Sequence, residues 1–334
     1  MELQALLMQC AGAVGIGHHR GIFEVIRSAL SPHFHLQETE QYLLAELSLG
    51  REKTLLLEAH ADEVGMIVTE VFDDGFLSVT SVGSVDGRFL PSTPVTVYGT
   101  KPVAGVFTSV PPHLKKEETC PSFEECYIDT GIKNIGEIVS LGDLAHFDAK
   151  PLPLQNGRLT GKALDNRTGV AAVITAANRL AEQKDCPVNL RLLFPLGEEL
   201  GLRGARVGAF AHPADEAVVV DVSFGDHPEV PSHQTARLGS GAMIGCSPVL
   251  SRRISDRLVH HAKAAEIPYT LEVMGGTTST DADVISVTAT GIPTGLVSIP
   301  LRNMHTPCEV VDLADVAAVS DLLYHYAMGG GLDD

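Results

Sequence analysis

An adjacent pair of glutamates, Glu198-Glu199, follows a segment with the pattern of a buried β-strand. In residues 188–194 the apolar side chains alternate along the chain, and Pro195 and Gly197 then end the pattern. The pair is therefore expected just past the carboxyl end of a core strand, where open α/β sheets bind ligands. Two acids can also simply open a helix, because the helix dipole favours them there. The pair by itself does not decide between these roles.

A histidine and several acids follow the apolar strand Leu55–Leu57. His60 and Asp62 are two residues apart, and residues at that spacing share a strand face, so Asp62 could orient the ring of His60. The alternative is a solvent-exposed strand end. Asp165 directly precedes a segment with helical apolar periodicity, where an acid can be an ordinary N-cap or can bridge two cations.

Two further polar residues follow apolar strands. Asp221 ends the strand 217–220, where an unpartnered buried carboxylate would be unfavourable. His305 lies in a loop after the strand 295–301, although with fourteen histidines in the chain the residue type alone is uninformative. Two histidines and three carboxylates form a donor set for two divalent ions of the zinc, cobalt or manganese type, which leaves one carboxylate as a base. The six residues that share this placement are His60, Asp165, Glu198, Glu199, Asp221 and His305.

The elements expected to position these residues alternate between strands and helices. Helices are expected at residues 22–30, from 165 onward, at 254–265 and at 316–326, and strands at 42–47, 54–59, 188–194, 217–220, 269–274 and 295–301. Between residues 66 and 149 the pattern changes to short alternating strands separated by turn residues. The sequence therefore predicts an α/β fold, a mixed, largely parallel sheet flanked by helices, formed by residues 1–65 and 150–334 and interrupted by a small all-β domain at 66–149.

Composition limits the functional class. A formal net charge of −18 over 334 residues argues against nucleic acid or an anionic membrane as a partner. No segment approaches the roughly 20 consecutive apolar residues of a membrane span. Six cysteines without a CxxC pair indicate free thiols, and Glu2 stands where a signal peptide carries positive charge. These features predict a cytoplasmic protein.

The chain resembles the tetrahedral aminopeptidases, cytosolic two-metal peptidases that include glutamyl, leucyl and lysyl aminopeptidases and proteins labelled endoglucanase. The motifs that carry the resemblance occur in the family's order over nearly the whole chain: Ala59-His-Ala-Asp-Glu-Val-Gly65, Leu164-Asp-Asn-Arg167, Gly197-Glu-Glu-Leu-Gly201, Val220-Asp221, Thr280-Asp-Ala282 and Ile299-Pro-Leu-Arg-Asn-Met-His305. The resemblance implies a zinc-exopeptidase-like fold and the removal of N-terminal residues from short peptides. It also implies dimers that assemble into a hollow dodecamer, with the inserted domain contributing to assembly and substrate access.

The resemblance also implies a role for each site residue. One zinc or cobalt ion, or alternatively manganese, would be held by His60, Asp165 and Asp221, and a second by Asp165, Glu199 and His305. Asp62 would orient His60, and Glu198 would be the general base. Independently of the resemblance, Arg302 could bind an acidic side chain of the substrate or could pair with a surface acid, and Asp281 is a further candidate for substrate binding.

Two segments depart from the family's pattern. Residues 15–21, Gly-Ile-Gly-His-His-Arg-Gly, replace its usual N-terminal turn, and residues 275–282 are longer than its Gly-Gly-Thr-Asp-Ala segment. The preferred N-terminal residue of the substrate is therefore not predicted.

Two alternatives stay open at this point. One is another two-metal amide hydrolase, a carboxypeptidase or deacylase, because a metal site alone does not determine which end of the substrate is bound and cleaved. The other is a non-catalytic assembly subunit of the same fold. Cleavage of glycosides fits poorly, because it needs two metal-free carboxylates flanking the bond.

Overall fold

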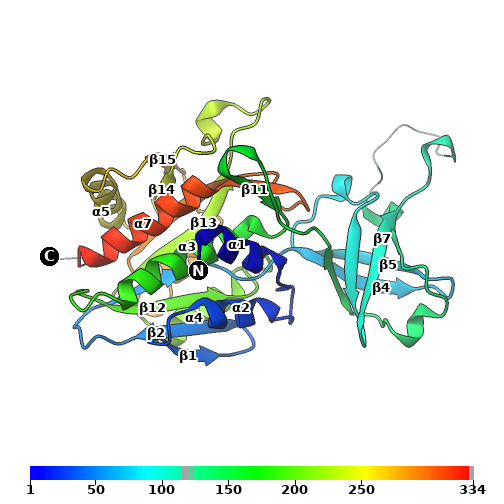
Figure 1. The fold of residues 1–334 in the computed structure, drawn as a ribbon, viewed down its shortest axis with the longest axis horizontal. Coiled ribbons are helices and arrows are strands. Elements are labelled where there is room, and N and C mark those ends of the chain that lie inside the picture. The colour runs from blue at the N-terminus through cyan, green and yellow to red at the C-terminus, as the bar shows by residue number, and fades with distance from the viewer. Residues whose placement is uncertain (115–120, 122, 331–334) are drawn as a thin grey trace.

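The structure, a computed structural model, describes residues 1–114, 121 and 123–330 of the chain. It contains a helix-flanked mixed sheet and a separate closed β-barrel that extends from one end of it (Figure 1). This arrangement confirms the predicted fold class.

The centre of the 11-stranded sheet is formed by four parallel strands. They lie side by side in the order β12 (Asn189–Pro195), β3 (Thr54–Glu58), β13 (Glu216–Phe224) and β16 (Thr294–Arg302). Their side chains are mostly apolar and buried, as expected for parallel strands covered on both faces. Because the strands are parallel, their carboxyl ends meet at one edge of the sheet.

The outer strands pair mainly antiparallel. On one side, β2 (Tyr42–Leu47) pairs with β12, and β1 (His35–Glu38) pairs with β2. The other side continues from β16 through β17 (Glu309–Asp312), β11 (Arg158–Gly161) and β10 (Leu152–Pro153). A branch from β16 consists of β14 (Ala242–Cys246), which pairs antiparallel to it, and β15 (Tyr269–Val273), which runs parallel to β14. Strands β1, β10, β11, β14 and β17 were not among the predicted elements.

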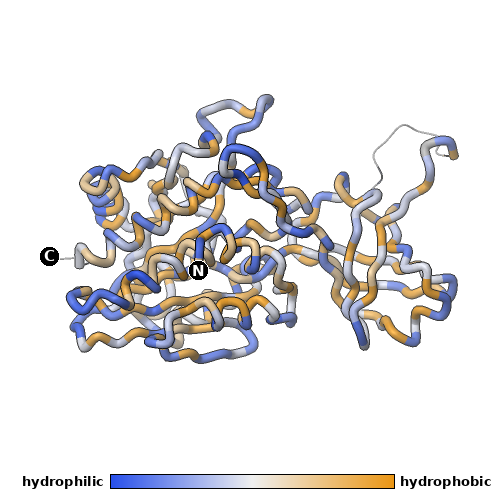
Figure 2. The backbone as a smooth tube through the Cα atoms, in the orientation of Figure 1, coloured by the Kyte–Doolittle hydropathy of each residue, from blue (hydrophilic) through white to orange (hydrophobic). Residues whose placement is uncertain are grey.

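Helices cover both faces of the sheet. One apolar core contains residues of α1 (Leu3–Gly12), α2 (Gly21–Ala29), α3 (Leu164–Ala181), α5 (Arg252–Ala264) and α7 (Leu313–Met328). A second core contains residues of α4 (Arg203–Ala211) and α6 (Ala282–Ile285). The apolar segments gather in the interior and the polar ones in peripheral turns (Figure 2). None of the helices in the described part of the chain is long and apolar enough to cross a membrane.

The barrel has its own apolar core. Its strands close in the order β4 (Gly65–Val71), β5 (Phe76–Val82), β8 (Tyr127–Asp129), β7 (Pro102–Thr108), β6 (Pro94–Tyr98) and β9 (Leu144–Phe147). Met66, Val97 and Phe107 are among the buried side chains that fill it. No disulfide bond joins the cysteines of the described residues, and Cys120 lies outside them.

Candidate metal centre and active site

Asp165 lies between the two histidines predicted as metal ligands. Its Oδ1 is 3.1 Å from His60 Nε2, and its Oδ2 is 3.3 Å from His305 Nε2. His60 follows β3, Asp165 is the second residue of α3, and His305 follows β16. Asp165 makes no N-cap hydrogen bond, so the N-cap alternative is wrong. His60 is only 2% exposed, which excludes a solvent-exposed strand end.

Asp221 and Glu199 complete two groups around this carboxylate. The predicted place of Asp221 at the end of its strand is wrong, because β13 stays paired with β16 through Phe224 and Asp221 lies within it. Asp221 Oδ1 lies 3.7 Å from His60 Nε2, and Glu199 Oε1 lies 3.1 Å from His305 Nε2. The donor atoms of His60, Asp165 and Asp221 all lie within 4.8 Å of one another, and so do those of Asp165, Glu199 and His305. The parallel strand order explains this arrangement, because it brings strand ends from distant parts of the sequence to one edge.

The glutamate pair Glu198-Glu199 lies in the loop between β12 and α4. It is not in the first turn of a helix, since α4 begins at Arg203. Asp62 fixes this loop. Its Oδ1 accepts a hydrogen bond from the backbone N–H of Glu198 at 3.2 Å, and its Oδ2 accepts one from the backbone N–H of Glu199 at 3.3 Å. Asp62 Oδ1 is also 3.3 Å from His60 Nδ1, so a single carboxylate positions the histidine ring and the glutamate pair.

The charged groups of the cluster shift one another's pKa values. Burial, with repulsion from Asp221, raises the pKa of Glu198 to about 9. Burial opposes the ionised form of Asp165 as well, but hydrogen bonds from the two histidines hold its pKa well below the usual range. Burial disfavours a charged His305, yet the Asp165 and Glu199 carboxylates raise the pKa of His305 to about 11. Positive charge therefore stabilises the ionised carboxylates here.

The chemistry of these residues fits divalent metal ions. His60 Nδ1 and Glu199 Oε1 are buried, and their contacts with Asp62 and His305 lack hydrogen-bond geometry, so the cluster is not closed by hydrogen bonds of its own. Imidazole nitrogens and carboxylate oxygens are ligands of zinc, cobalt and manganese. A divalent ion in either group would supply the positive charge that the neighbouring carboxylates favour.

Glu309 is a site residue that the sequence did not reveal. It begins β17 and is 1% exposed. Its Oε1 accepts a hydrogen bond from the backbone N–H of His305 at 2.7 Å, and its Oε2 accepts one from the backbone N–H of Asp165 at 3.1 Å. One side chain thus holds the backbones of two candidate ligands that are 140 residues apart. The only sequence signal is its position four residues after His305, which indicates no partner.

The metal-ligand cluster opens into a cavity of about 580 Å³. Thr278, Ser279 and Thr280, from the segment that is longer than the family pattern, lie in its wall. The two residues predicted to bind substrate, Arg302 and Asp281, are not among its lining residues. Arg302 pairs with Asp226, with Nη2 2.7 Å from Oδ1, and Asp281 is 1% exposed and lies against Glu58.

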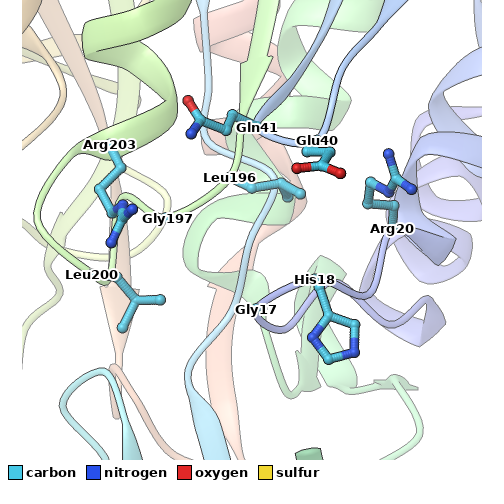
Figure 3. Close-up of a pocket in the computed structure, with 9 residues that line it drawn as sticks. All are labelled: Gly17, His18, Arg20, Glu40, Gln41, Leu196, Gly197, Leu200 and Arg203. Atoms are coloured by element: carbon cyan, nitrogen blue, oxygen red, sulfur yellow. The ribbon is translucent and has the colours of Figure 1, made fainter.

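The atypical turn at residues 15–21 lies at a different cavity. Gly17, His18 and Arg20 line a hollow of about 330 Å³ together with residues of the loop that follows β12 (Figure 3). In Figure 3 Arg203 and Leu200 stand on one side of this hollow and Arg20 on the other. No candidate metal ligand lines it. The atypical turn is therefore separate from the metal-ligand cavity.

A mixed α/β sheet that gathers buried histidines and carboxylates at its carboxyl edge is the architecture of a metallopeptidase. The chain belongs to the M42 glutamyl aminopeptidase family, whose sequence model matches residues 44–322. A putative aminopeptidase from Acetivibrio thermocellus is 34% identical to it over 335 residues, 95% of this chain and 96% of that protein.

Two solved structures show the same fold over nearly the whole chain. The aminopeptidase APDkam598 from the archaeon Desulfurococcus kamchatkensis matches with a TM-score of 0.90 and 29% identity, covering 98% of this chain and 94% of that one. The TET1 peptidase of Pyrococcus horikoshii matches with a TM-score of 0.86 and 26% identity, covering 98% of this chain and 99% of that one. That peptidase is described as able to assemble into a tetrahedron or a large octahedral shell. The resemblance to the tetrahedral aminopeptidases is thus confirmed, and the chain is a peptidase of the metallo-aminopeptidase type.

Proposed function

We propose that this protein is a two-metal aminopeptidase in which Glu198 is the general base. The observation that carries the proposal is the placement of Asp165, whose two carboxylate oxygens face two different histidines. A bridging carboxylate of this kind is what a pair of closely spaced ions requires. His60 and Asp221 would complete one site, and Glu199 and His305 the other.

Two divalent ions, when bound, would polarise the scissile carbonyl and lower the pKa of the attacking water. Zinc and cobalt suit the nitrogen and oxygen donors, and manganese is a third candidate. Asp62 would keep the His60 ring oriented through its contact with Nδ1.

Glu198 lines the cavity but belongs to neither ligand group. Its carboxylate would take a proton from the attacking water and donate it to the nitrogen of the leaving amine. The backbone hydrogen bonds to Asp62 hold it in place beside Glu199. Burial and the neighbouring acids raise the pKa of Glu198, and bound divalent ions would oppose that shift.

The role of Glu198 is tested by Glu198→Gln, which keeps the shape and removes the base. We expect kcat to fall about 10²- to 10⁴-fold, because a positioned general base contributes about that much. Metal content, measured by elemental analysis, should match the wild type. Normal turnover in this variant would refute the assignment.

The end of the substrate that is cleaved is tested with paired peptides that differ only in an N-terminal acetyl group. An aminopeptidase cleaves the free peptide, and a deacylase or an N-blocked peptide hydrolase prefers the acetylated one. Carboxypeptidase action would release the C-terminal residue of both peptides, which mass spectrometry of the products distinguishes.

We also propose self-association into dimers and a dodecamer, in a cytoplasmic setting. The support is the match to the TET1 peptidase over the whole chain. Residues 66–149, which contain the barrel, would contribute contacts between subunits and limit substrate access. Light scattering coupled to size-exclusion chromatography should give twelve times the 35.5 kDa chain mass. A monomer at micromolar concentration would refute this part.

A further inference from the structure

One carboxylate in the metal-ligand cavity is not used by the proposed mechanism. Glu272 projects from β15 into the cavity. Ser298 Oγ, from β16, donates a hydrogen bond to its Oε2 at 2.7 Å, and Ser223 Oγ, from β13, donates one to its Oε1. Two hydroxyl groups thus hold this side chain in a fixed orientation.

The strand register places Glu272 close to the proposed metal ligands. Asp221 and Ser298 are partners across β13 and β16, and neighbouring strands are about 5 Å apart. Asp221 and Ser223 are two residues apart on β13 and therefore face the same side of the sheet. The two serines that bind Glu272 are the neighbours of Asp221 along and across the sheet. Glu272 consequently lies on the same face as the metal centre, one side chain away from it.

Apart from the two histidines proposed as metal ligands, the described residues of the cavity wall include no cationic side chain. The other carboxylates among its described lining residues are those of the proposed ligands and of Glu198, and the histidines there are His60 and His305. No lysine or arginine lines it among the described residues. Two divalent ions would balance the four carboxylates at the reaction centre and leave the charge of Glu272 uncompensated. Burial raises the pKa of Glu272 against the two serine hydrogen bonds, which shows that its charge is poorly solvated.

The rest of the wall consists of apolar side chains and of serine and threonine hydroxyl groups. Val222, Met274, Leu296 and Met304 are among its apolar lining residues. Apolar lining residues beside one carboxylate that the mechanism does not use match a side chain that has an aliphatic stem and a cationic tip, because such side chains bury the stem and pair the tip. Glutamate or aspartate side chains would instead meet a like charge.

We infer that Glu272 makes this protein selective for an N-terminal lysine or arginine, whose cationic group would pair with the Glu272 carboxylate. This inference rests on the proposed aminopeptidase function. A neutral apolar side chain of similar length would occupy the same space but would leave Glu272 buried without a counter-charge. The expected preference for lysine over leucine is about 10- to 100-fold in kcat/KM.

The test compares lysyl, arginyl, leucyl and glutamyl anilides with three forms of the metal-loaded protein. These are the wild type, Glu272→Gln and the control Glu229→Gln, which removes one negative charge from an exposed position in the loop after β13. Glu272→Gln should lower kcat/KM for the lysyl and arginyl substrates about 10- to 100-fold, mainly through KM, and leave the leucyl substrate nearly unchanged. Glu229→Gln should leave all four values unchanged.

A readout without turnover completes the test. Lysinamide should inhibit the wild type competitively, and Glu272→Gln should weaken that inhibition by the same factor as it raises KM. A wild type that prefers the leucyl or glutamyl substrate would overturn the inference, even if the variant fails to fold. An equal loss for all four substrates would also overturn it, because that result indicates recognition of the common α-amino group. If the wild type cleaves none of the anilides, the proposed function itself has failed.

Discussion

Replacing Glu309 by glutamine should weaken metal binding although no metal ligand is changed. Its two oxygens accept the backbone N–H groups of His305 and Asp165 at 2.7 and 3.1 Å. Glutamine keeps one acceptor, but its amide NH₂ faces the second N–H group and cannot accept from it. One hydrogen bond at a position 1% exposed is therefore lost and one buried donor is left without a partner.

The size of the effect follows from that loss. A buried polar group left without its partner raises the free energy by about 1–3 kcal/mol. Asp165 and His305 both belong to the second ligand group, so misplacing either reduces its affinity. We expect about 10- to 100-fold weaker binding at that group, the range found when residues supporting metal ligands are changed. Glu309→Ala, which removes both acceptors, should have a larger effect than Glu309→Gln.

The assay is a competition titration of the metal-stripped protein against a chromogenic chelator. Glu182→Gln is the matched control, because Glu182 is exposed at the end of α3, the helix that begins beside Asp165. It removes the same charge without touching the site and should bind metal as the wild type does. If Glu309→Gln binds two ions per chain with wild-type affinity, Glu309 does not position the ligands.

Three further predictions concern stability. Removing the metal ions with a chelator should lower the melting temperature measured by scanning calorimetry, because an ion present at 100 times its Kd stabilises the fold by about 2.7 kcal/mol per site. An unchanged melting temperature would contradict the assignment of a metal site. Burial opposes the ionised form of Glu63, but Lys162, with Nζ 2.6 Å away, and its other cationic neighbours hold its pKa well below the usual range. Ionised Glu63 therefore stabilises the folded state at pH values above the unfolded pKa of about 4.3, and this stabilisation is lost progressively as the pH falls below that value. In urea titrations Glu63→Gln should be less stable than the wild type by about 3–5 kcal/mol at pH 7 and by less at pH 4. An equal difference at both pH values would refute this assignment. Gly15→Ala should lower the melting temperature, because a Cβ there would overlap Arg167 Nη2 and lie 2.8 Å from Ala61 O, whereas the control Gly12→Ala meets no atom within 4 Å and should not.

Much of the fold was predictable because its signals are local. The apolar runs of β3, β13 and β16 and the periodicity of α3, α5 and α7 identify these elements within a residue or a few of their observed bounds. The missed elements are short or contain glycine, as in α4 with its sequence Arg-Gly-Ala-Arg-Val-Gly. Their conformation depends on neighbours that come from elsewhere in the chain. Propensity summed over so few residues cannot reveal them.

The sequence by itself determined that His60, Asp165, Glu198, Glu199 and His305 lie at strand ends or at a helix start, because each position follows from its own neighbours. Asp221 was expected at a strand end as well, but β13 continues past it to Phe224. Tertiary structure alone decided which atoms face one another, since this depends on strand order and register. Asp165 meets both histidines because Asn166, the next residue of α3, donates a hydrogen bond from Nδ2 to Val220 O of β13, and β13 lies between β3 and β16. Glu309 and Glu272 reach the site from β17 and β15, outside the parallel centre of the sheet. No local pattern encodes such pairings, because they are contacts between segments far apart in the chain.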